Sequence, residues 1–223
     1  MVRAMVVSPK PEGRRERKKR ETRERILQVA AQMFAQDGFD AVTVESLAEA
    51  ADISKPTLFN YFPSKMAILQ ALVPEVDQRF ANAIERFRLE GGSVSRQLGR
   101  FFEFGGSQTR KTPKLTRSLL VLALRGYEDT DLKPTQHRWP LMRGSFEALL
   151  SDGVARGEVR SDISIERLTH YITSVYVYGL LNWLADPQYS VETELAIASQ
   201  FLGSAVAAER ALSPTASAVA GAL

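Results

Sequence analysis

The chain has 223 residues, of which 44% are hydrophobic and 25% charged, and its formal net charge is +3. This composition is typical of a globular protein long enough to bury one core or two smaller ones. The absence of cysteine excludes disulfides and thiolate metal sites, and no apolar run approaches the roughly 20 residues of a membrane-spanning helix, so we expect a cytoplasmic protein without membrane contact.

The N-terminal segment is basic. Residues 14–25 hold eight Arg and Lys side chains among three Glu and one Thr. We expect residues 1–20 to form a flexible basic arm, although this segment can equally be a solvated leader or the polar start of a helix. In front of a DNA-binding helix pair, such an arm would contact phosphates or the minor groove.

Apolar residues recur at helical spacing through nearly the whole chain, and no alternating β-branched run demands a sheet. The pattern therefore predicts an all-α fold of about nine helices. In chain order these helices cover 22–36, 43–51, 56–62, 65–90, 93–104, 114–126, 134–156, 165–185 and 191–210. We expect an N-terminal helical domain over 21–80, a C-terminal helical domain over 81–211 and a flexible tail over 212–223.

The segment 43–65 reads as two short helices around a tight turn, with a helix-turn-helix at about 44–63. Leu47, Ala51 and Leu58 can form the small core between the helices. An α-helix fits the major groove of DNA, and residues at its N-terminus reach the base edges. The candidate DNA-binding residues are Thr43, Ser54, Lys55, Pro56, Thr57, Phe59, Asn60, Tyr61 and Lys65.

These residues are expected to divide between base and phosphate contacts. Thr57 and Asn60 lie one turn apart and could read bases. Lys55, Tyr61 and Lys65, with the start of the first short helix, are placed for phosphates, which position a protein without specifying sequence. The alternative is that the aromatic residues belong to the core and that Lys65 is an ordinary surface charge.

Residues 22–72 resemble the N-terminal domain of the TetR (tetracycline-repressor) family. The resemblance includes the aromatic-x-Tyr-Phe-x-x-Lys motif, which here runs from Phe59 to Lys65, and a weaker similarity lies at 155–162. Asp52 stands where a turn glycine is common, and Pro56 stands where a small residue is usual. Aspartate tolerates left-handed backbone conformations, and proline is acceptable in the first turn of a helix.

The resemblance implies a homodimer, formed through about 165–210, that binds a near-palindromic operator in double-stranded DNA. Small residues on the last helix would permit close approach of the two subunits, and the preceding helix would contribute apolar ones. These residues are Ala196, Ser199, Gly203 and Ala207, then Leu168, Ile172, Val175, Gly179 and Trp183. The alternative is that they serve the core of a single subunit.

The resemblance also implies a ligand pocket between the middle helices. The candidate residues are Phe101, Phe104, Leu120, Leu124, Tyr127, His137, Trp139, Met142, Phe146, Tyr171 and Tyr178. Each could instead be a core residue, because helical aromatics usually are. The apolar character of the set favours a hydrophobic or aromatic effector. The fourth helix would carry the response, and its Pro74 could be a hinge or a static kink.

The sequence therefore predicts a homodimeric, ligand-released repressor. The alternative is a DNA-binding activator, or a partner-controlled regulator with no small-molecule ligand. Enzyme activity is not expected, because phosphate-binding loops, nucleophile elbows and zinc-binding His pairs are absent. The two histidines, His137 and His170, are better explained as pocket or surface residues, and we expect neither a cofactor nor a metal.

Overall fold

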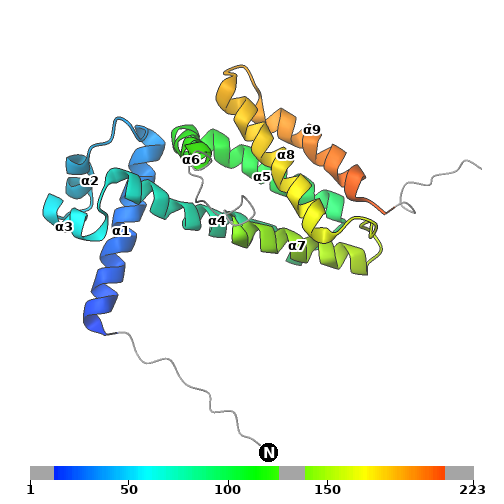
Figure 1. Ribbon diagram of the computed structural model, residues 1–223, viewed down its shortest axis with the longest axis horizontal. Helices are drawn as coiled ribbons and strands as arrows, with labels where there is room; N and C mark the ends of the chain where they lie inside the picture. The colour runs from blue at the N-terminus through cyan, green and yellow to red at the C-terminus, as the bar shows by residue number, and fades with distance from the viewer. Residues whose placement is uncertain (1–12, 126–138, 209–223) are drawn as a thin grey trace, which may run out of the picture. The chain divides into compact units, whose positions relative to one another are not determined.

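The computed structural model describes residues 13–125 and 139–208. Nine α-helices lie in these ranges, which confirms the all-α prediction (Figure 1). They are α1 (Arg14–Gln36), α2 (Val44–Ala50), α3 (Lys55–Tyr61), α4 (Lys65–Leu89), α5 (Val94–Lys111), α6 (Pro113–Arg125), α7 (Pro140–Ala155), α8 (Ile165–Ala185) and α9 (Val191–Val206). Across the described part of the chain, no helix combines the length and the apolarity needed to cross a membrane.

The chain divides into two compact units between Ala71 and Leu72, within the continuous helix α4. The first unit contains α1, α2, α3 and the start of α4. Its core is made of buried apolar side chains from all four helices, among them Ile26, Phe34, Leu47, Leu58 and Ile68. Burial of such side chains contributes about 1.5–3 kcal/mol each, so this core holds the short helices α2 and α3 in place.

Helix α1 begins earlier than expected, at Arg14 rather than near Thr22. Residues 14–20, which we expected in a flexible arm, are therefore helical, and residues 1–12 lie outside the described part. Pairs four residues apart support the extension: Arg17 lies 3.6 Å from Glu21 and Arg20 lies 3.0 Å from Glu24. Opposite charges at this spacing stabilise a helix, and the segment contains no helix breaker.

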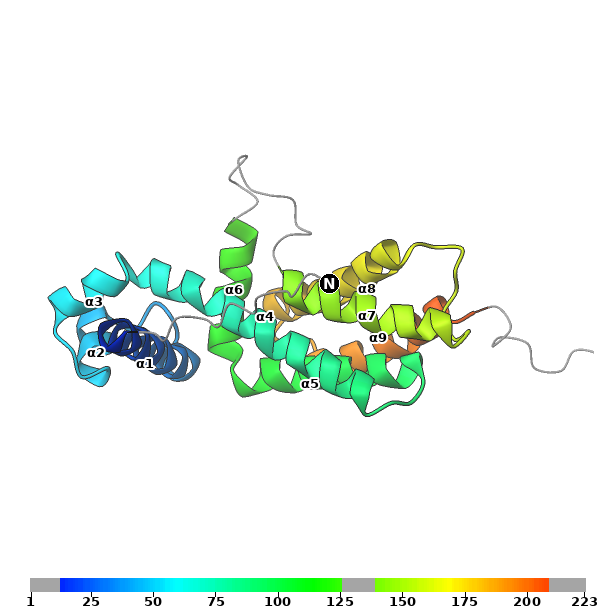
Figure 2. The same ribbon diagram turned by 90° about the horizontal axis from the view of Figure 1, so that it is seen from below.

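The second unit is a helical bundle in which α5 packs along α9, while α8 contacts both α7 and α9 (Figures 1 and 2). Aromatic rings dominate its core. Phe101 lies 4.7 Å from Phe146 and 5.2 Å from Tyr176 between ring centroids. Edge-to-face pairs of this kind add to the stabilisation that burial alone provides.

The predicted helix break at Gly105-Gly106 is wrong, because α5 continues to Lys111. Both glycines serve close packing instead. A Cβ atom on Gly105 would lie 2.6 Å from the ring of Tyr176, and one on Gly106 would lie 3.2 Å from the side chain of Glu192. Glycine here allows α8 and α9 to approach α5, at the small cost that glycine imposes on a helix.

Two other helix ends differ from expectation. Helix α9 ends at Val206 instead of 210, where the chain leaves the helix and pairs Ala207 with Val159 in an isolated antiparallel bridge. Helix α7 begins at Pro140, and the residues before 139 that we expected in this helix lie outside the described ranges. The tail after 208 also lies outside them.

The segment 155–162, which showed the weaker family similarity, connects the end of α7 to the start of α5. A Glu158 carboxylate oxygen accepts the Val94 N–H at 2.9 Å and so caps the start of α5, while Arg156 donates to its other oxygen at 2.8 Å. Hydrogen bonds from Arg156 and then from the Val94 N–H lower the pKa of Glu158. In the part of the chain that the structure describes, this segment serves packing and capping.

Candidate functional site

The turn between α2 and α3 has the geometry of a helix-turn-helix. Ala51 is fully buried at the end of α2, and the next residue, Asp52, has a φ of 52°. No other non-glycine residue in 13–125 and 139–208 has a positive φ. Aspartate is one of the few residues that adopt this left-handed conformation at low cost, so it replaces the expected turn glycine without disturbing the fold.

Hydroxyl groups cap both short helices. Thr43 Oγ1 accepts the Ser46 N–H at 3.1 Å, and Ser46 Oγ accepts the Thr43 N–H at 3.1 Å, which together form a capping box. Ser54 Oγ accepts the Thr57 N–H at 3.2 Å at the start of α3, and Pro56 occupies the first turn. The side chains of Thr43 and Ser54 are thus used by the fold.

Helix α3 buries Leu58 and presents the rest of its length outward. Lys55, Phe59 and Asn60 are exposed, and Thr57 and Tyr61 are half-buried. Phe59 is 42% exposed, so it is not a core residue. This short helix has one buried side chain and an outer surface of amide, hydroxyl, ammonium and aromatic groups. Groups of these kinds form hydrogen bonds with bases and phosphates in a DNA groove.

The ammonium of Lys55 forms an ion pair with Glu45 of α2, and this hydrogen bond lowers the pKa of that carboxyl. Lys55 Nζ also lies 6.0 Å from the centroid of the Phe59 ring. Both Lys55 and Glu45 are exposed, so the pair is weak and the ammonium can exchange it for a phosphate.

Lys65 already has two partners within the fold. Its Nζ donates to the carbonyl oxygens of Phe39 at 2.6 Å and Val42 at 2.7 Å, and lies 4.4 Å from the centroid of the Phe39 ring. The ammonium therefore joins the start of α4 to the connection between α1 and α2. The side chain is part-buried and makes two hydrogen bonds, so Lys65 is not an ordinary surface charge, and its phosphate contact stays a prediction.

Replacing Lys65 with methionine is expected to lower the free energy of unfolding of the first unit by about 2 kcal/mol, because two carbonyls lose a charged donor. Hydrogen exchange of the α2 and α3 amides measures this change. Lys55→Met is the matched control and should change stability by less than about 0.5 kcal/mol. A Lys65→Met protein of unchanged stability, with a flatter salt dependence of DNA binding, would support the phosphate role.

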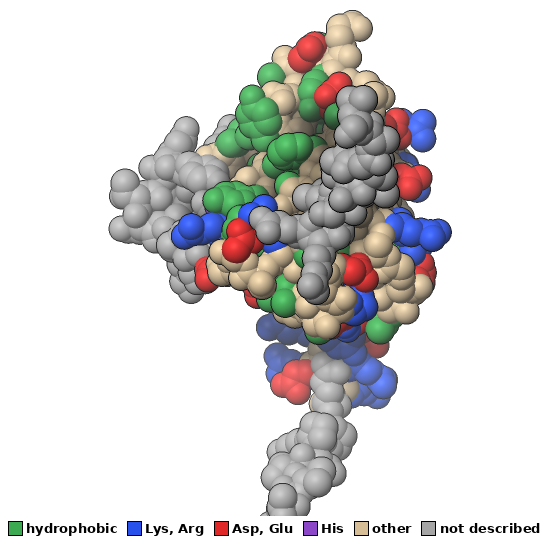
Figure 3. All heavy atoms as spheres, turned by 90° about the vertical axis from the view of Figure 1, so that its right-hand side faces the viewer, with side chains coloured by type: hydrophobic (Ala, Val, Ile, Leu, Met, Phe, Trp, Pro, Cys, Tyr) green, Lys and Arg blue, Asp and Glu red, His purple; other side chains and the backbone are tan. Residues whose placement is uncertain are grey.

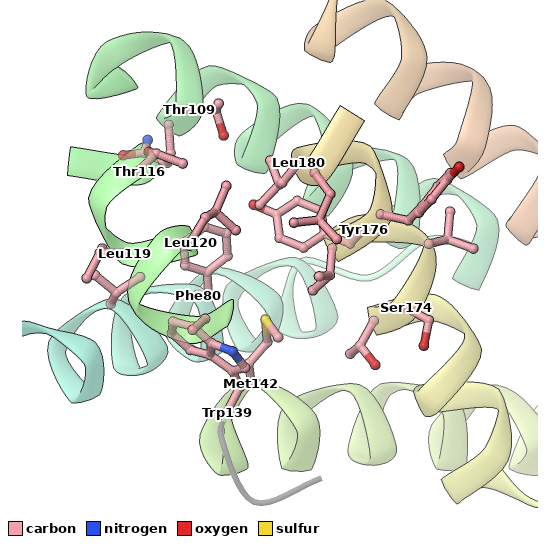
Figure 4. A pocket seen from close by; sticks show the side chains of 18 of the residues that line it. Phe80, Thr109, Thr116, Leu119, Leu120, Trp139, Met142, Ser174, Tyr176 and Leu180 are labelled. Carbon is pink, nitrogen blue, oxygen red and sulfur yellow. The ribbon is translucent and has the colours of Figure 1, made fainter. Parts of the chain in front are cut away.

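The second unit contains a partly open cavity of about 760 Å³, lined by residues of α4, α5, α6, α7 and α8. Figure 4 shows Phe80 from α4, Leu119 and Leu120 from α6, and Tyr176 and Leu180 from α8 around this space, with Trp139 and Met142 below. The wall is largely apolar, and this size is typical of small-molecule sites.

The sequence-predicted pocket residues fall into four groups. The cavity wall includes Leu120, Leu124, Trp139, Met142 and Tyr178. The core behind the wall contains Phe101, Phe104 and Phe146, which do not line the cavity. Tyr171 does not line the cavity as predicted, because it is 49% exposed on the surface of α8. Tyr127 and His137 lie outside the described residues.

Sequence reasoning missed the threonines and the α4 residues of the wall. Thr109, Thr112 and Thr116 line the cavity from α5, its C-cap and α6, and Val76 and Phe80 line it from α4. The helical spacing of Val76 and Phe80 was visible in the sequence, but it indicated only a buried face. The pocket prediction was based on aromatic residues, and several of these lie in the core. The core and the cavity wall have similar compositions, so composition alone does not separate them.

Tyr176 separates the cavity from the core. Its hydroxyl pairs with Thr109, and complete burial raises the pKa of the Tyr176 phenol above its ordinary value. The Phe80 ring centroid lies 6.0 Å from that of Tyr176, which places α4 directly against this part of the wall.

Asp77 of α4 is 2% exposed and caps α7 from a different helix. Its Oδ2 accepts the Leu141 N–H at 3.0 Å and its Oδ1 accepts the Met142 N–H at 2.9 Å. Both amides belong to the first turn of α7, where a carboxylate satisfies unpaired donors and complements the helix dipole. Trp139 and Met142 line the cavity, so α4 and the wall are held together at this point.

The small-residue stripe predicted on α9 lies largely inside the unit. Ser199 and Gly203 are buried against α5, where a Cβ on Gly203 would lie 2.9 Å from that of Ser95. Ala196 is exposed, and Ala207 lies beyond the helix. On α8, Leu168, Ile172 and Gly179 are buried in the core, while Val175 and Trp183 are half-buried.

The exposed apolar face of α8 and α9 is made of larger side chains. Tyr171 and Tyr178 lie two turns apart on α8, and Ile197 and Phe201 lie one turn apart on α9. Phe201 is 68% exposed and Tyr178 is 66% exposed. Figure 3 shows hydrophobic side chains gathered on the upper part of this face. Residues at this spacing share one side of a helix, so each pair forms an exposed apolar stripe on its own helix.

Comparison with known proteins places the helix-turn-helix in a family. Residues 26–72 match the sequence profile described as bacterial regulatory proteins, tetR family. The chain is 28% identical over 165 residues to the HTH-type transcriptional repressor KstR of Mycolicibacterium smegmatis, covering 74% of this chain and 78% of KstR. It is 33% identical over 78 residues to the HTH-type transcriptional regulator TcmR of Streptomyces glaucescens, covering 35% and 34% of the two chains.

Solved structures share the fold over most of the chain. Salmonella enterica GusR superposes with a TM-score of 0.62 at 25% identity, covering 83% of this chain and 94% of GusR. Thermus thermophilus FadR, a TetR-family transcriptional repressor solved with lauroyl-CoA, superposes with a TM-score of 0.65 at 24% identity, covering 89% and 100%.

Proposed function

We propose that this chain, which belongs to the tetR family of bacterial regulatory proteins, is a homodimeric repressor released from its operator by a small apolar effector. The chain is a DNA-binding transcriptional regulator and not an enzyme. One observation carries the effector part of the proposal. The cavity of about 760 Å³ has α4 in its wall, and α4 continues into the first unit.

In the proposed DNA complex, α3 enters the major groove. Thr57 and Asn60 contact bases, because they lie one turn apart on the outward side of the helix. Lys55 and Tyr61 contact phosphates, together with exposed Arg and Lys side chains of α1. Phe59, exposed beside Lys55, packs against the sugar-phosphate backbone.

The proposed dimer forms through the exposed stripes of α8 and α9. Soluble monomers rarely expose a contiguous patch of large apolar side chains without a partner. A two-fold interface pairs the same patch on both subunits and places two recognition helices on successive major grooves. The proposed arrangement predicts a near-palindromic operator, and it assigns the dimer contact to the exposed Ile197 and Phe201 instead of the buried small residues of α9.

An open cavity also bears on the alternative, a regulator without a small-molecule ligand. Such a protein would gain stability by filling this space, since empty apolar volume costs free energy. The cavity therefore supports the effector-controlled regulator over a partner-controlled one. The proposed response is a shift between DNA-competent and incompetent geometries, with a coupling of about 1–3 kcal/mol.

Footprinting on the promoter of the protein's own gene, followed by binding to that fragment at several salt concentrations, tests the DNA complex. Asn60→Ala is expected to reduce discrimination between operator and mismatched DNA by about tenfold, because one base contact is worth about 1–3 kcal/mol. Its salt dependence should be unchanged, since no phosphate contact is lost.

Gln78→Ala, an exposed amide of α4 in the second unit, is the matched control and should bind as the wild type does. An Asn60→Ala protein that still distinguishes operator from mismatched DNA would remove Asn60 from base recognition. The absence of any protected site on the promoter and on random genomic fragments would contradict the proposed function.

A further inference from the structure

The charged side chains among the described lining residues of the cavity are all basic. Among the described lining residues, Arg79, Arg143 and His170 are the basic or titratable-basic side chains, and none is aspartate or glutamate. A cationic effector would find no carboxylate among the described residues that line this cavity. An anionic group would be attracted by the basic lining side chains, since charges near a low-dielectric wall are only partly screened.

The arginines differ in what they already bind. Arg143 donates to Glu147 at 2.9 Å and to Glu166 at 3.0 Å, so its charge is compensated by the link between α7 and α8. Arg79 is exposed on α4 and, within residues 13–125 and 139–208, its guanidinium has no ion-pair or hydrogen-bond partner. Among the described lining residues, Arg79 is therefore the cation whose charge is not compensated by a partner.

The position of Arg79 also fits an amphipathic molecule. Phe80 and Val76, on the same helix, line the apolar space, while the exposed Arg79 lies where the wall meets solvent. A charged group loses much free energy when it is buried without a partner, so it remains at such an edge while the apolar body occupies the interior. Guanidinium groups bind carboxylates through two parallel hydrogen bonds.

We propose that the effector is an apolar carboxylic acid whose carboxylate binds Arg79 and whose body fills the space between α4, α6 and α8. This inference rests on the proposed function and names the chemical class of its ligand. It also assigns a role to α4, because the helix that continues into the helix-turn-helix unit contributes the charged contact. A ligand that binds α4 directly can favour one of its positions over another.

Three fluorescent probes with the same ring system test this inference: 1-pyrenebutanoate, 1-pyrenebutanol and 1-pyrenebutylammonium. Their dissociation constants are measured on the full chain by fluorescence titration. The acid is expected to bind about tenfold more tightly than the alcohol, and the amine more weakly than both. The preference for the acid should shrink as salt is added, because a rim contact is screened.

Arg79→Gln supplies the decisive variant, and Arg86→Gln on the same helix, paired with Glu90 outside the cavity wall, is its matched control. Arg79→Gln should weaken binding of the acid five- to tenfold, by about 1 kcal/mol, and leave the alcohol within about twofold. Arg86→Gln should leave all three probes unchanged. Circular dichroism melting of both variants checks that they fold alike.

Equal binding of the three probes, or an equal loss for all three in Arg79→Gln, would overturn the inference, and so would the absence of binding by any of them. These results would leave the proposed function standing if a neutral apolar compound still lowered operator affinity. Conversely, an acid that binds through Arg79 without changing operator affinity would contradict the proposed effector response and leave the charge preference intact.

Discussion

Replacing Phe201 with glutamate is expected to make the protein monomeric and to lower its operator affinity by at least about 100-fold. Phe201 is 68% exposed and lies one turn from Ile197, in the α9 stripe that we assign to the two-fold interface. A charge at this position would be buried against its own copy across the symmetry axis, where it has no partner. Because the proposed dimer binds two linked half-sites, its loss should remove most of the operator affinity.

Sedimentation velocity measures the subunit association, and fluorescence anisotropy of an operator fragment measures the binding. Leu89→Glu is the matched control, because Leu89 is 73% exposed on α4, outside the stripes of α8 and α9. The control should remain dimeric and bind DNA normally. A Phe201→Glu protein that is still a dimer would show that another surface carries the association.

Replacing Asp77 with alanine is expected to lower the free energy of unfolding of the second unit by about 3 kcal/mol, because two charge-assisted hydrogen bonds are lost. The Leu141 and Met142 amides would then be unpaired at the start of α7, and the dipole of that helix would lose its compensating charge. Few positions in this unit combine such complete burial with such specific bonding.

Urea unfolding followed by the fluorescence of Trp139 and Trp183 reports on this unit. Asp77→Asn retains one acceptor and should lose about half as much stability, while Glu103→Ala, at an exposed position of α5, should change it by less than about 0.5 kcal/mol. An Asp77→Ala protein as stable as the wild type would mean that water replaces the carboxylate.

Asp77→Asn should also respond less to an effector, because α4 is then held less firmly to the cavity wall.

The sequence was sufficient for the helices and for the helix-turn-helix, because these depend on local signals. Thr43, Ser54 and Pro56 occupy the capping and first-turn positions that their chemistry favours. Asp52 has the left-handed conformation that its place in the turn requires. Such features are decided within a few residues of the chain, so a single sequence contains them.

Contacts between distant segments could not be predicted in the same way. Nothing in the neighbourhood of Lys65 indicates that its ammonium binds carbonyls of residues 39 and 42, and nothing near Asp77 indicates a cap for a helix that begins at Pro140. Gly105 was misread because a helix-breaking glycine and a close-packing glycine look alike until the neighbouring helix is placed. The division of aromatics between core and cavity depends on the same long-range packing.

Operator binding and occupancy of the cavity are expected to oppose each other in this protein. The most direct measurement is the dissociation constant of 1-pyrenebutanoate, taken once with the free protein and once with the protein bound to its operator fragment. Linkage requires the two constants to differ by the same factor by which the acid lowers operator affinity, and we expect about 5- to 150-fold. Equal affinity of the acid for the free and the DNA-bound protein would contradict the account.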